Sequence, residues 1–218
     1  MKFRYRYPKL NYYSIFFVAL LAGCATGPST SDIERARPET PINVSNLKIA
    51  PIGAGKVEMN MAPRKVGSYH STVFPFLVAV NTADYNNARK LTPEFHSACK
   101  RMIEDTLAEA GYDVAGRDEL FVESDLSRGR FLIGGEIVDV AMNSYEGVPK
   151  YRTAGNIKIE WQVYDVVKKA IIYKTTTTAE NLVNNSDGIG LSFIMIDDAL
   201  RNLLAKKDLV ETLSEASK

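Results

Sequence analysis

The spacing of hydrophobic positions predicts two amphipathic helices. The first lies between Thr92, whose hydroxyl can cap a helix start, and Gly111, which ends the pattern, and Pro93 suits its first position. Its apolar residues recur every three or four positions: Phe95, Cys99, Met102, Ile103, Leu107 and Ala110. The second begins near Leu191, and its apolar stripe is Phe193, Ile196, Leu200, Leu203 and Leu204. A shorter continuation is indicated by Leu209, Val210 and Leu213.

Alternating apolar and polar residues predict strands between and before these helices. The candidates are residues 46–52, 131–142, 155–166 and 170–179. We expect the first strand to end in a loop at Gly53 and Gly55. The last two are joined by a charged turn at 165–169, which predicts a hairpin with one buried and one wet face.

Residues 72–80 are also strand-like, but Pro75 cannot donate a ladder hydrogen bond, so they predict an edge strand or an extended cover segment. Three strands in succession predict an antiparallel sheet, and the two helices can cover one apolar face of it. The expected fold is therefore α+β. Residues 44–218 would form this domain, with an insertion at about 54–91.

The amino-terminal segment has the pattern of an export signal. Four cationic residues precede an apolar core of roughly ten residues, which is too short to span a bilayer. The core ends in Leu21-Ala22-Gly23-Cys24, which resembles the lipobox of bacterial lipoprotein signal peptides. The alternative is a first buried helix with a chance cysteine. The order of charge, apolar run, small residues and cysteine favours the signal.

The lipobox resemblance implies a modification and a location. Leu21, Ala22 and Gly23 would be recognised by the processing machinery, and residues 1–23 would be removed. Cys24 would then carry a covalent diacylglycerol and an N-acyl chain such as palmitate, with residues 24–43 as a lipidated tether. Ala25 replaces the aspartate that favours inner-membrane retention in enterobacterial lipoproteins. The resemblance therefore implies the periplasmic face of the outer membrane.

Charge and cysteine content narrow the chemistry. The signal removes four cations, so Lys+Arg falls from 27 to 23 against 26 Asp+Glu, a net charge of −3 that argues against nucleic acid as a partner. With Cys24 acylated, Cys99 is the remaining thiol, and with two histidines it offers little material for a metal site. We therefore expect no metal and no cofactor beyond the covalent lipid.

Candidate catalytic residues do not form a recognisable set. His96 and Cys99 are three positions apart, but no orienting acid is indicated, so a buried structural cysteine is favoured. Adjacent Asp197 and Asp198 point about 100° apart on a helix, which predicts a solvated helix face rather than a carboxylate pair. A hydrolase using His70 or His96 has no support in the spacing. We expect no catalytic residues and no enzymatic activity.

The order of elements resembles a known periplasmic domain. The segments at 47–53, 92–111, 131–140, 157–164 and 170–178, with the terminal helix, are similar in layout to CsgG-like lipoproteins of curli secretion. The TolB amino-terminal domain and lipoprotein activators of penicillin-binding proteins are similar in the same way. This resemblance covers roughly residues 45–205 and implies an envelope machine as the setting.

Two functions follow from these expectations. The first is a non-enzymatic adaptor or assembly factor, which binds another envelope protein or itself in a secretion, cell-wall or surface-assembly machine. Its contacts would be aromatic residues outside the predicted core, namely Tyr69, Phe74, Tyr145 and Tyr151. The alternative is a CsgG-like secretion pore subunit, for which only residues 57–80 offer room for membrane strands, with two prolines among them. Lipid handling through an apolar groove also stays open.

Overall fold

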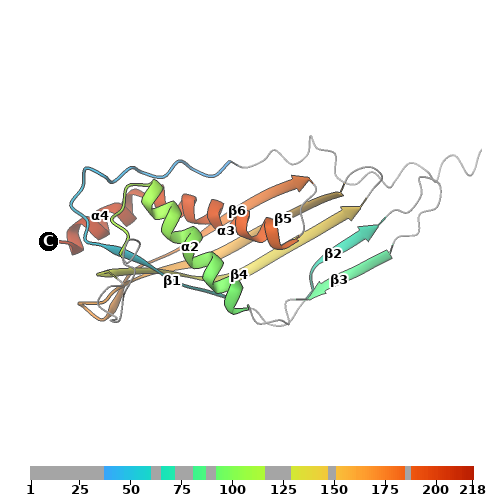
Figure 1. Ribbon diagram of the computed structural model, residues 1–218, viewed down its shortest axis with the longest axis horizontal. Helices are drawn as coiled ribbons and strands as arrows, with labels where there is room; N and C mark the ends of the chain where they lie inside the picture. Colours follow the sequence, from blue (N-terminus) through green and yellow to red (C-terminus); the bar gives the residue numbers. More distant parts are fainter. Residues whose placement is uncertain are drawn as a thin grey trace, which may run out of the picture. The chain divides into compact units, whose positions relative to one another are not determined.

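The computed structural model describes residues 37–59, 65–71, 81–86, 92–115, 129–146, 151–184 and 188–218, which belong to the compact unit Arg35–Lys218. The described elements are β1 (Ile52–Met59), β2 (Lys65–Ser71), β3 (Asn81–Asn86), α2 (Pro93–Glu109), β4 (Phe131–Glu146), β5 (Tyr151–Asp165), β6 (Ala170–Asn184), α3 (Gly188–Leu204) and α4 (Lys207–Ala216) (Figure 1). The predicted signal peptide, Cys24, most of the tether, the 72–80 segment and Phe74 lie outside the described residues.

The predicted α+β fold is confirmed. The described strands form a six-stranded sheet in the order β3-β2-β4-β5-β6, with β1 beside β4. The neighbours β4, β5 and β6 are antiparallel, as expected from their succession in the chain. Helices α2 and α3 lie side by side over one face of this sheet (Figure 1).

Two strands of the predicted insertion run parallel to β4. The first half of β4 pairs with β1, from Phe131 opposite Ile52 onward. The second half of β4 pairs with β2, from Met142 opposite Gly67 onward. β1 and β2 therefore follow one another along the same edge of β4, and β3 returns antiparallel to β2. The sheet is mixed because α2 separates β1 and β2 from β4 in the chain, which allows a crossover to a parallel partner.

The prediction for the first strand was wrong. Residues 46–50 are not in a strand, and β1 begins at Ile52 and continues through Gly53 and Gly55. Glycine fits here because a Cβ on Gly55 would lie 3.0 Å from the carbonyl oxygen of Ile133 on β4. The pairing also shifts register between Ala54 and Val57. A close approach to the neighbouring strand, rather than a loop, therefore explains this glycine.

The predicted boundaries of α2 are confirmed, and α3 begins at Gly188, three residues before its predicted start. Thr92 caps α2 by accepting a 3.2 Å hydrogen bond from the backbone N–H of Phe95, and Gly111 has a φ of 88° just after the helix. In the β5–β6 hairpin the helix-facing residues are buried, among them Ile157, Ile159, Trp161 and Val163, while most of their neighbours in β5 are polar and less buried. The predicted hairpin with one buried and one wet face is therefore confirmed.

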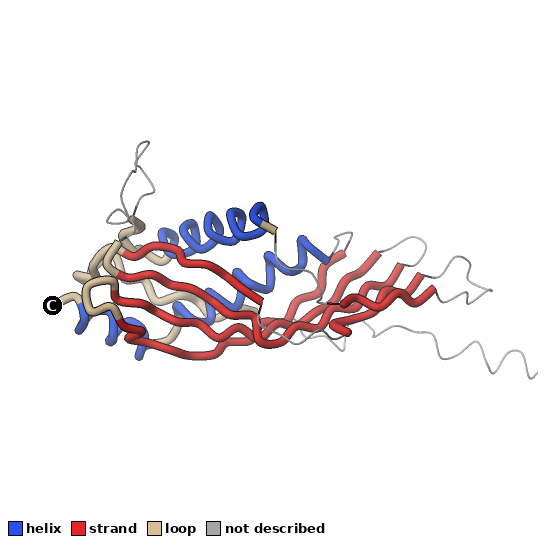
Figure 2. Tube along the Cα trace, turned by 90° about the horizontal axis from the view of Figure 1, so that it is seen from below, coloured by secondary structure: helices blue, strands red, loops and turns tan. Residues whose placement is uncertain are grey.

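The strands β4, β5 and β6 are longer than the helices that cover them. With 16, 15 and 15 residues, they each span about 50 Å. The start of α3 meets the sheet at Met142, where the Ser192 hydroxyl donates to the Met142 sulfur at 3.5 Å. Past this point the sheet continues as residues 143–146, 151–154 and 181–184 together with β2 and β3 (Figure 2). We call this part the distal end of the sheet.

Residues 37–50 lead into the domain across the ends of both long helices. The N–H of Ile42 donates to the carbonyl oxygen of Leu204 at 3.1 Å, and the N–H of Val44 donates to that of Ala110 at 3.0 Å. Helix carboxyl ends leave carbonyl groups without intrahelical partners, and these two bonds satisfy such groups. Part of the predicted tether, residues 37–43, thus already contacts the folded domain.

Candidate functional site

Three of the four aromatic residues predicted to contact a partner lie on the distal end. Tyr69 is in β2 opposite Ser144, Tyr145 is in β4 opposite Arg152, and Tyr151 is in β5 opposite Glu146. These positions belong to three neighbouring strands, although Tyr69 is far from the other two in sequence. Phe74 lies outside the described residues. The pairing puts the positions of Tyr69 and Tyr151 on the face of the sheet that carries Ser144, and the position of Tyr145 on the opposite face.

A buried hydroxyl pair ties the strands together next to these tyrosines. The side-chain oxygens of Ser144 on β4 and Thr153 on β5 are 3.1 Å apart, and both residues are fully buried. A hydrogen-bonded polar pair in a buried position favours one strand register, because a slip would separate the two hydroxyl groups. The tyrosine positions are thus carried on a backbone of defined geometry, as a binding surface requires.

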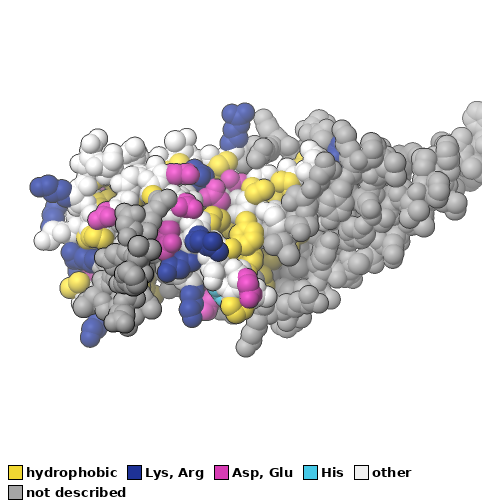
Figure 3. All heavy atoms as spheres, viewed as in Figure 1, with side chains coloured by type: hydrophobic (Ala, Val, Ile, Leu, Met, Phe, Trp, Pro, Cys, Tyr) yellow, Lys and Arg dark blue, Asp and Glu magenta, His cyan; other side chains and the backbone are white. Residues whose placement is uncertain are grey.

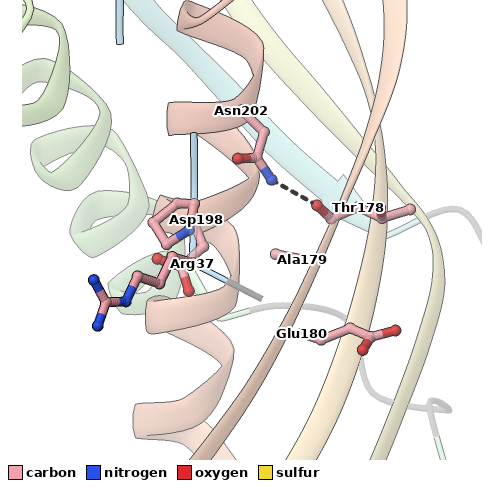
Figure 4. Close-up of a pocket in the computed structure, with 7 residues that line it drawn as sticks. Arg37, Thr178, Ala179, Glu180, Asp198 and Asn202 are labelled. Atoms are coloured by element: carbon pink, nitrogen blue, oxygen red, sulfur yellow. Dashed lines mark hydrogen bonds between the residues drawn. The ribbon is translucent and has the colours of Figure 1, made fainter. Parts of the chain in front are cut away.

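A cavity of about 280 Å³ lies at the edge of the domain, between β6, α3 and the segment that precedes Val44. Its lining includes Arg37, Asp198 and Asn202 (Figure 4). The Asn202 side chain donates to the carbonyl oxygen of Thr178 at 2.9 Å and accepts from the N–H of Glu39 at 2.6 Å. The Asn202 amide therefore connects the entering segment to β6, so this part of the cavity wall has a structural role.

The predicted solvated face at Asp197 and Asp198 was wrong. Asp197 accepts hydrogen bonds from the Thr106 hydroxyl at 2.6 Å and from Arg201 Nε at 2.9 Å. Asp198 is buried and accepts a 2.8 Å bond from the Asn181 side-chain amide. The two carboxylates do diverge, as adjacent helical positions must, and each meets a different neighbour. Asp197 joins α3 to α2, and Asp198 joins α3 to β6.

The thiol of Cys99 is enclosed in the core. The residue is 1% exposed, and burial raises the pKa of its thiol to about 11. A thiol in this state is protonated near neutral pH and is a poor nucleophile. The Nδ1 atom of nearby His96 is buried without a hydrogen-bond partner among the described residues. The structure therefore supports the structural interpretation of Cys99.

The exposed surface of the helix layer carries both charges. Acidic and basic side chains alternate over the face that bears α2 (Figure 3), with Lys100 and Glu104 forming an ion pair of 3.7 Å. Arg201 links Asp197 and Glu109 across the two helices, with a 2.8 Å contact to the latter. Such mixed charge gives this face no single-sign field that would attract a charged partner.

The described part of the chain offers neither a metal-binding cluster nor a membrane-spanning helix. No group of three or more His, Cys, Asp or Glu side chains there is placed to hold a metal ion. No helix in the same residues combines the length and apolar character needed to cross a bilayer.

Exposed hydrophobic residues gather at the β5–β6 turn, which the sequence interpretation treated only as a charged turn. Four large hydrophobic side chains are exposed in the described residues, and Tyr164, Val167 and Ile171 are three of them. The sequence did carry a signal for these exposed residues. Tight turns favour glycine, asparagine and aspartate, whereas this turn has the sequence Val166-Val167-Lys168-Lys169.

Comparison with solved structures gave matches of low sequence identity, of which three are described here. No family model and no curated protein matches the chain. A protein of the DUF330 family from Xanthomonas campestris has 10% sequence identity and a TM-score of 0.39, over 84% of this chain and 95% of that chain. Two PelC structures from Paraburkholderia phytofirmans, both described as dodecamers, have 14% and 11% identity. Their TM-scores are 0.36 and 0.37, over 79% and 78% of this chain and 98% and 95% of theirs.

These values are too low to carry an argument about function. The likeness to CsgG-like and TolB amino-terminal domains accordingly stays a prediction from the order of elements.

Proposed function

We propose that this protein is a non-enzymatic, lipid-anchored envelope protein of the outer membrane, acting as an adaptor or assembly factor. Its acyl anchor would be on Cys24, and its partner would be a protein of a secretion, cell-wall or surface-assembly machine. The observation that carries the proposal is that the positions of Tyr69 and Tyr151, which are far apart in the sequence, share one face of the distal end, with Tyr145 on the other face. Tyrosine is among the residues that contribute most to protein interfaces.

The use of the polar groups inside the domain supports a binding role over a catalytic one. Asp197, Asp198 and Asn202 are engaged in joining helices and strands to each other. The buried Cys99 has a raised pKa that disfavours the thiolate. Enzymatic acid–base chemistry needs groups that reach a substrate and titrate near the working pH.

Self-association is the second candidate, and it includes the subunit of a secretion pore as its most elaborate form. The observation that favours it is the position of β6, a strand of 15 residues at the end of the hydrogen-bonded strand order. An end strand presents backbone N–H and C=O groups that another copy can pair with. Part of this edge already has partners within the described residues. The carbonyl oxygen of Thr178 accepts a hydrogen bond from Asn202, and α4 and the entering segment also lie near β6.

In-cell crosslinking with a carboxy-terminal tag, followed by purification and mass spectrometry, tests the adaptor proposal. We expect one abundant envelope protein to be recovered with the wild-type chain. Replacing Tyr69, Phe74, Tyr145 and Tyr151 by alanine should abolish its recovery while circular dichroism and the melting temperature show a folded domain. The control is Leu47→Ala, which removes an exposed hydrophobic side chain that lies outside the distal end.

The outcomes separate the candidates. If the fourfold variant still recovers the partner protein, the distal end is not the binding site. Recovery of only self-crosslinked rings favours the oligomer or pore over the adaptor. The anchor is tested separately by metabolic labelling with an alkyne analogue of palmitate, which the wild-type chain should incorporate and Cys24→Ser should not.

A further inference from the structure

The β5–β6 turn presents an apolar surface with a cationic border. Val167 is 72% exposed and Ile171 is 53% exposed, and Tyr164 pairs with Ile171 across the hairpin. Lys168 and Lys169 stand between them in the chain and are exposed as well. We call these five residues the hairpin tip. Single exposed hydrophobic residues are ordinary, but most of those described here lie within this one hairpin.

The fold holds the hairpin tip in a fixed conformation. The buried carboxylate of Asp165 accepts hydrogen bonds from the N–H groups of Val167 at 2.9 Å and Lys168 at 3.1 Å. Arg130 approaches the other carboxylate oxygen at 3.5 Å. Lys169 has a φ of 52°, a backbone conformation that residues other than glycine rarely adopt. An exposed valine is thus held rigidly at the point of the turn.

The charge of the tip is positive. Asp165 is the sole acidic residue in the stretch 164–171, and it faces Arg130 and the turn backbone. Desolvation opposes its ionisation, but the backbone hydrogen bonds and Arg130 outweigh it and keep the pKa of Asp165 below its usual range. Asp165 is therefore an ionised, internally paired carboxylate, and the two lysines face outward. Apolar side chains flanked by lysine and tyrosine are typical of segments that contact a lipid–water interface.

The point at which the chain enters the domain lies within reach of the tip. Arg37 lines the cavity next to Thr178 and Glu180, so the chain enters beside the middle of β6. From Thr178 to Ile171 the strand covers about 23 Å. Residues 24–36 reach at most roughly 45 Å when fully extended. A lipid on Cys24 and the hairpin tip can therefore touch the same membrane.

We propose that the hairpin tip docks onto an anionic phospholipid surface, with Val167 and Ile171 entering the interface and Lys168 and Lys169 contacting lipid phosphates. The docking rests on the proposed function in one respect, because the acyl anchor on Cys24 brings that surface close. In Figure 1 the tip lies at the end of the sheet opposite β2 and β3. Docking through the tip therefore leaves the distal end directed away from the membrane.

Vesicle sedimentation tests the docking without help from the anchor. The protein used begins at Ala25, so it lacks both the predicted signal peptide and Cys24. It is mixed either with anionic vesicles of phosphatidylglycerol and phosphatidylethanolamine or with neutral vesicles of phosphatidylcholine. We expect binding to the anionic vesicles and little to the neutral ones. K168E/K169E should weaken anionic binding at least about tenfold, and V167S/I171S about tenfold.

The matched control reverses two lysines elsewhere. Lys56 on β1 and Lys158 on β5 are exposed and lie outside the tip, so K56E/K158E changes the net charge equally. Its binding should stay within about twofold of wild type, since interfacial attraction acts near the surface. Equal losses in both double variants would overturn a specific role for the tip.

A fluorescent label reports the contact directly in a variant with little change in charge. V167C can be labelled selectively because the thiol of Cys99 is buried with a pKa raised to about 11. Anionic vesicles should shift an environment-sensitive dye at this position to shorter wavelength, and quencher-bearing lipids should reduce its emission. A shift that depends on protein concentration and not on lipid would overturn the proposal in favour of contact between two copies.

The two proposals fail independently. If palmitate analogue labels Cys24 and the unacylated chain does not bind vesicles, the docking is wrong and the anchor stands. If the unacylated chain binds anionic vesicles through the tip and Cys24 takes no label, the anchor is wrong and the docking stands.

Discussion

The indole Nε1 of Trp161 donates a 2.8 Å hydrogen bond to the hydroxyl of Thr177, and this hydroxyl donates a 2.7 Å bond to the carbonyl oxygen of Ala199. Three elements, β5, β6 and α3, are thereby joined through one threonine. Trp161 is fully buried and Thr177 nearly so. The large aromatic residue at the centre of the core thus has its polar atom satisfied, and α3 is held over the hairpin.

Thr177→Val should destabilise the domain by about 1–3 kcal/mol, because it leaves the buried indole N–H without a partner at almost unchanged volume. Urea unfolding followed by tryptophan fluorescence measures the loss. Thr176→Val is the control, since Thr176 is exposed on the other face of the same strand, and it should change stability by less than about 0.5 kcal/mol. Equal effects of the two substitutions would contradict the role of this hydrogen-bond chain.

The contact between α2 and α3 predicts that two substitutions of acidic residues differ in their effect on stability. Asp197→Ala should cost about 1–2 kcal/mol, because Arg201 loses one of its two carboxylates and the buried Thr106 hydroxyl keeps only its bond to the carbonyl oxygen of Met102. The Asp197 hydrogen bond is also the main cause that raises the pKa of Arg201. Glu109→Ala removes the other, 62% exposed carboxylate and should cost less than about 1 kcal/mol. Chemical denaturation of both variants checks the ranking, and a larger effect at Glu109 would reverse it.

The segment that enters the domain should contribute measurably to stability. Val44 is buried and its N–H bonds to the end of α2. Val44→Ala should cost about 1–3 kcal/mol through lost burial and a small cavity. Leu47→Ala, three residues on and exposed, should lie within about 0.5 kcal/mol of wild type. If thermal melts show no difference between the two, residues 37–44 are not part of the folded unit.

The buried thiol predicts an alkaline dependence of stability. The pKa of Cys99 is raised from an ordinary value near 9 to about 11 by burial, so between these pH values the unfolded chain loses the proton and the folded chain keeps it. The folded state binds more protons in this window, so the free energy of unfolding falls as pH rises from about 9 to 11. Tyr112 and Tyr173, each with a pKa raised to about 12 mainly by burial, extend the decline to higher pH.

Cys99→Ala should therefore show a shallower loss of stability across that window than wild type, in urea unfolding at a series of pH values. The same thiol should react slowly with a disulfide reagent at pH 8 until the chain is unfolded. Rapid reaction of the folded chain would show that Cys99 is accessible and would contradict the structural interpretation.

The sequence by itself determined the elements that depend on neighbours in the chain. The Thr92 cap, the apolar period of α2 and α3 and the alternation in β5 are local patterns, and each predicted the observed structure. The consequence for the fold also followed, because three successive strands and two amphipathic helices have few ways to bury their apolar faces.

Only the tertiary structure decided which distant segments meet. The parallel pairing of β1 and β2 with β4, the placement of Tyr69 opposite Ser144, and the burial of Asp198 against Asn181 all join residues far apart in sequence or on different elements. Their energies come from backbone ladders and buried hydrogen bonds that do not exist until the sheet has formed, so no local period records them. The exposure of Val167 is of the same kind, because packing of the whole hairpin decides which side of a turn faces water.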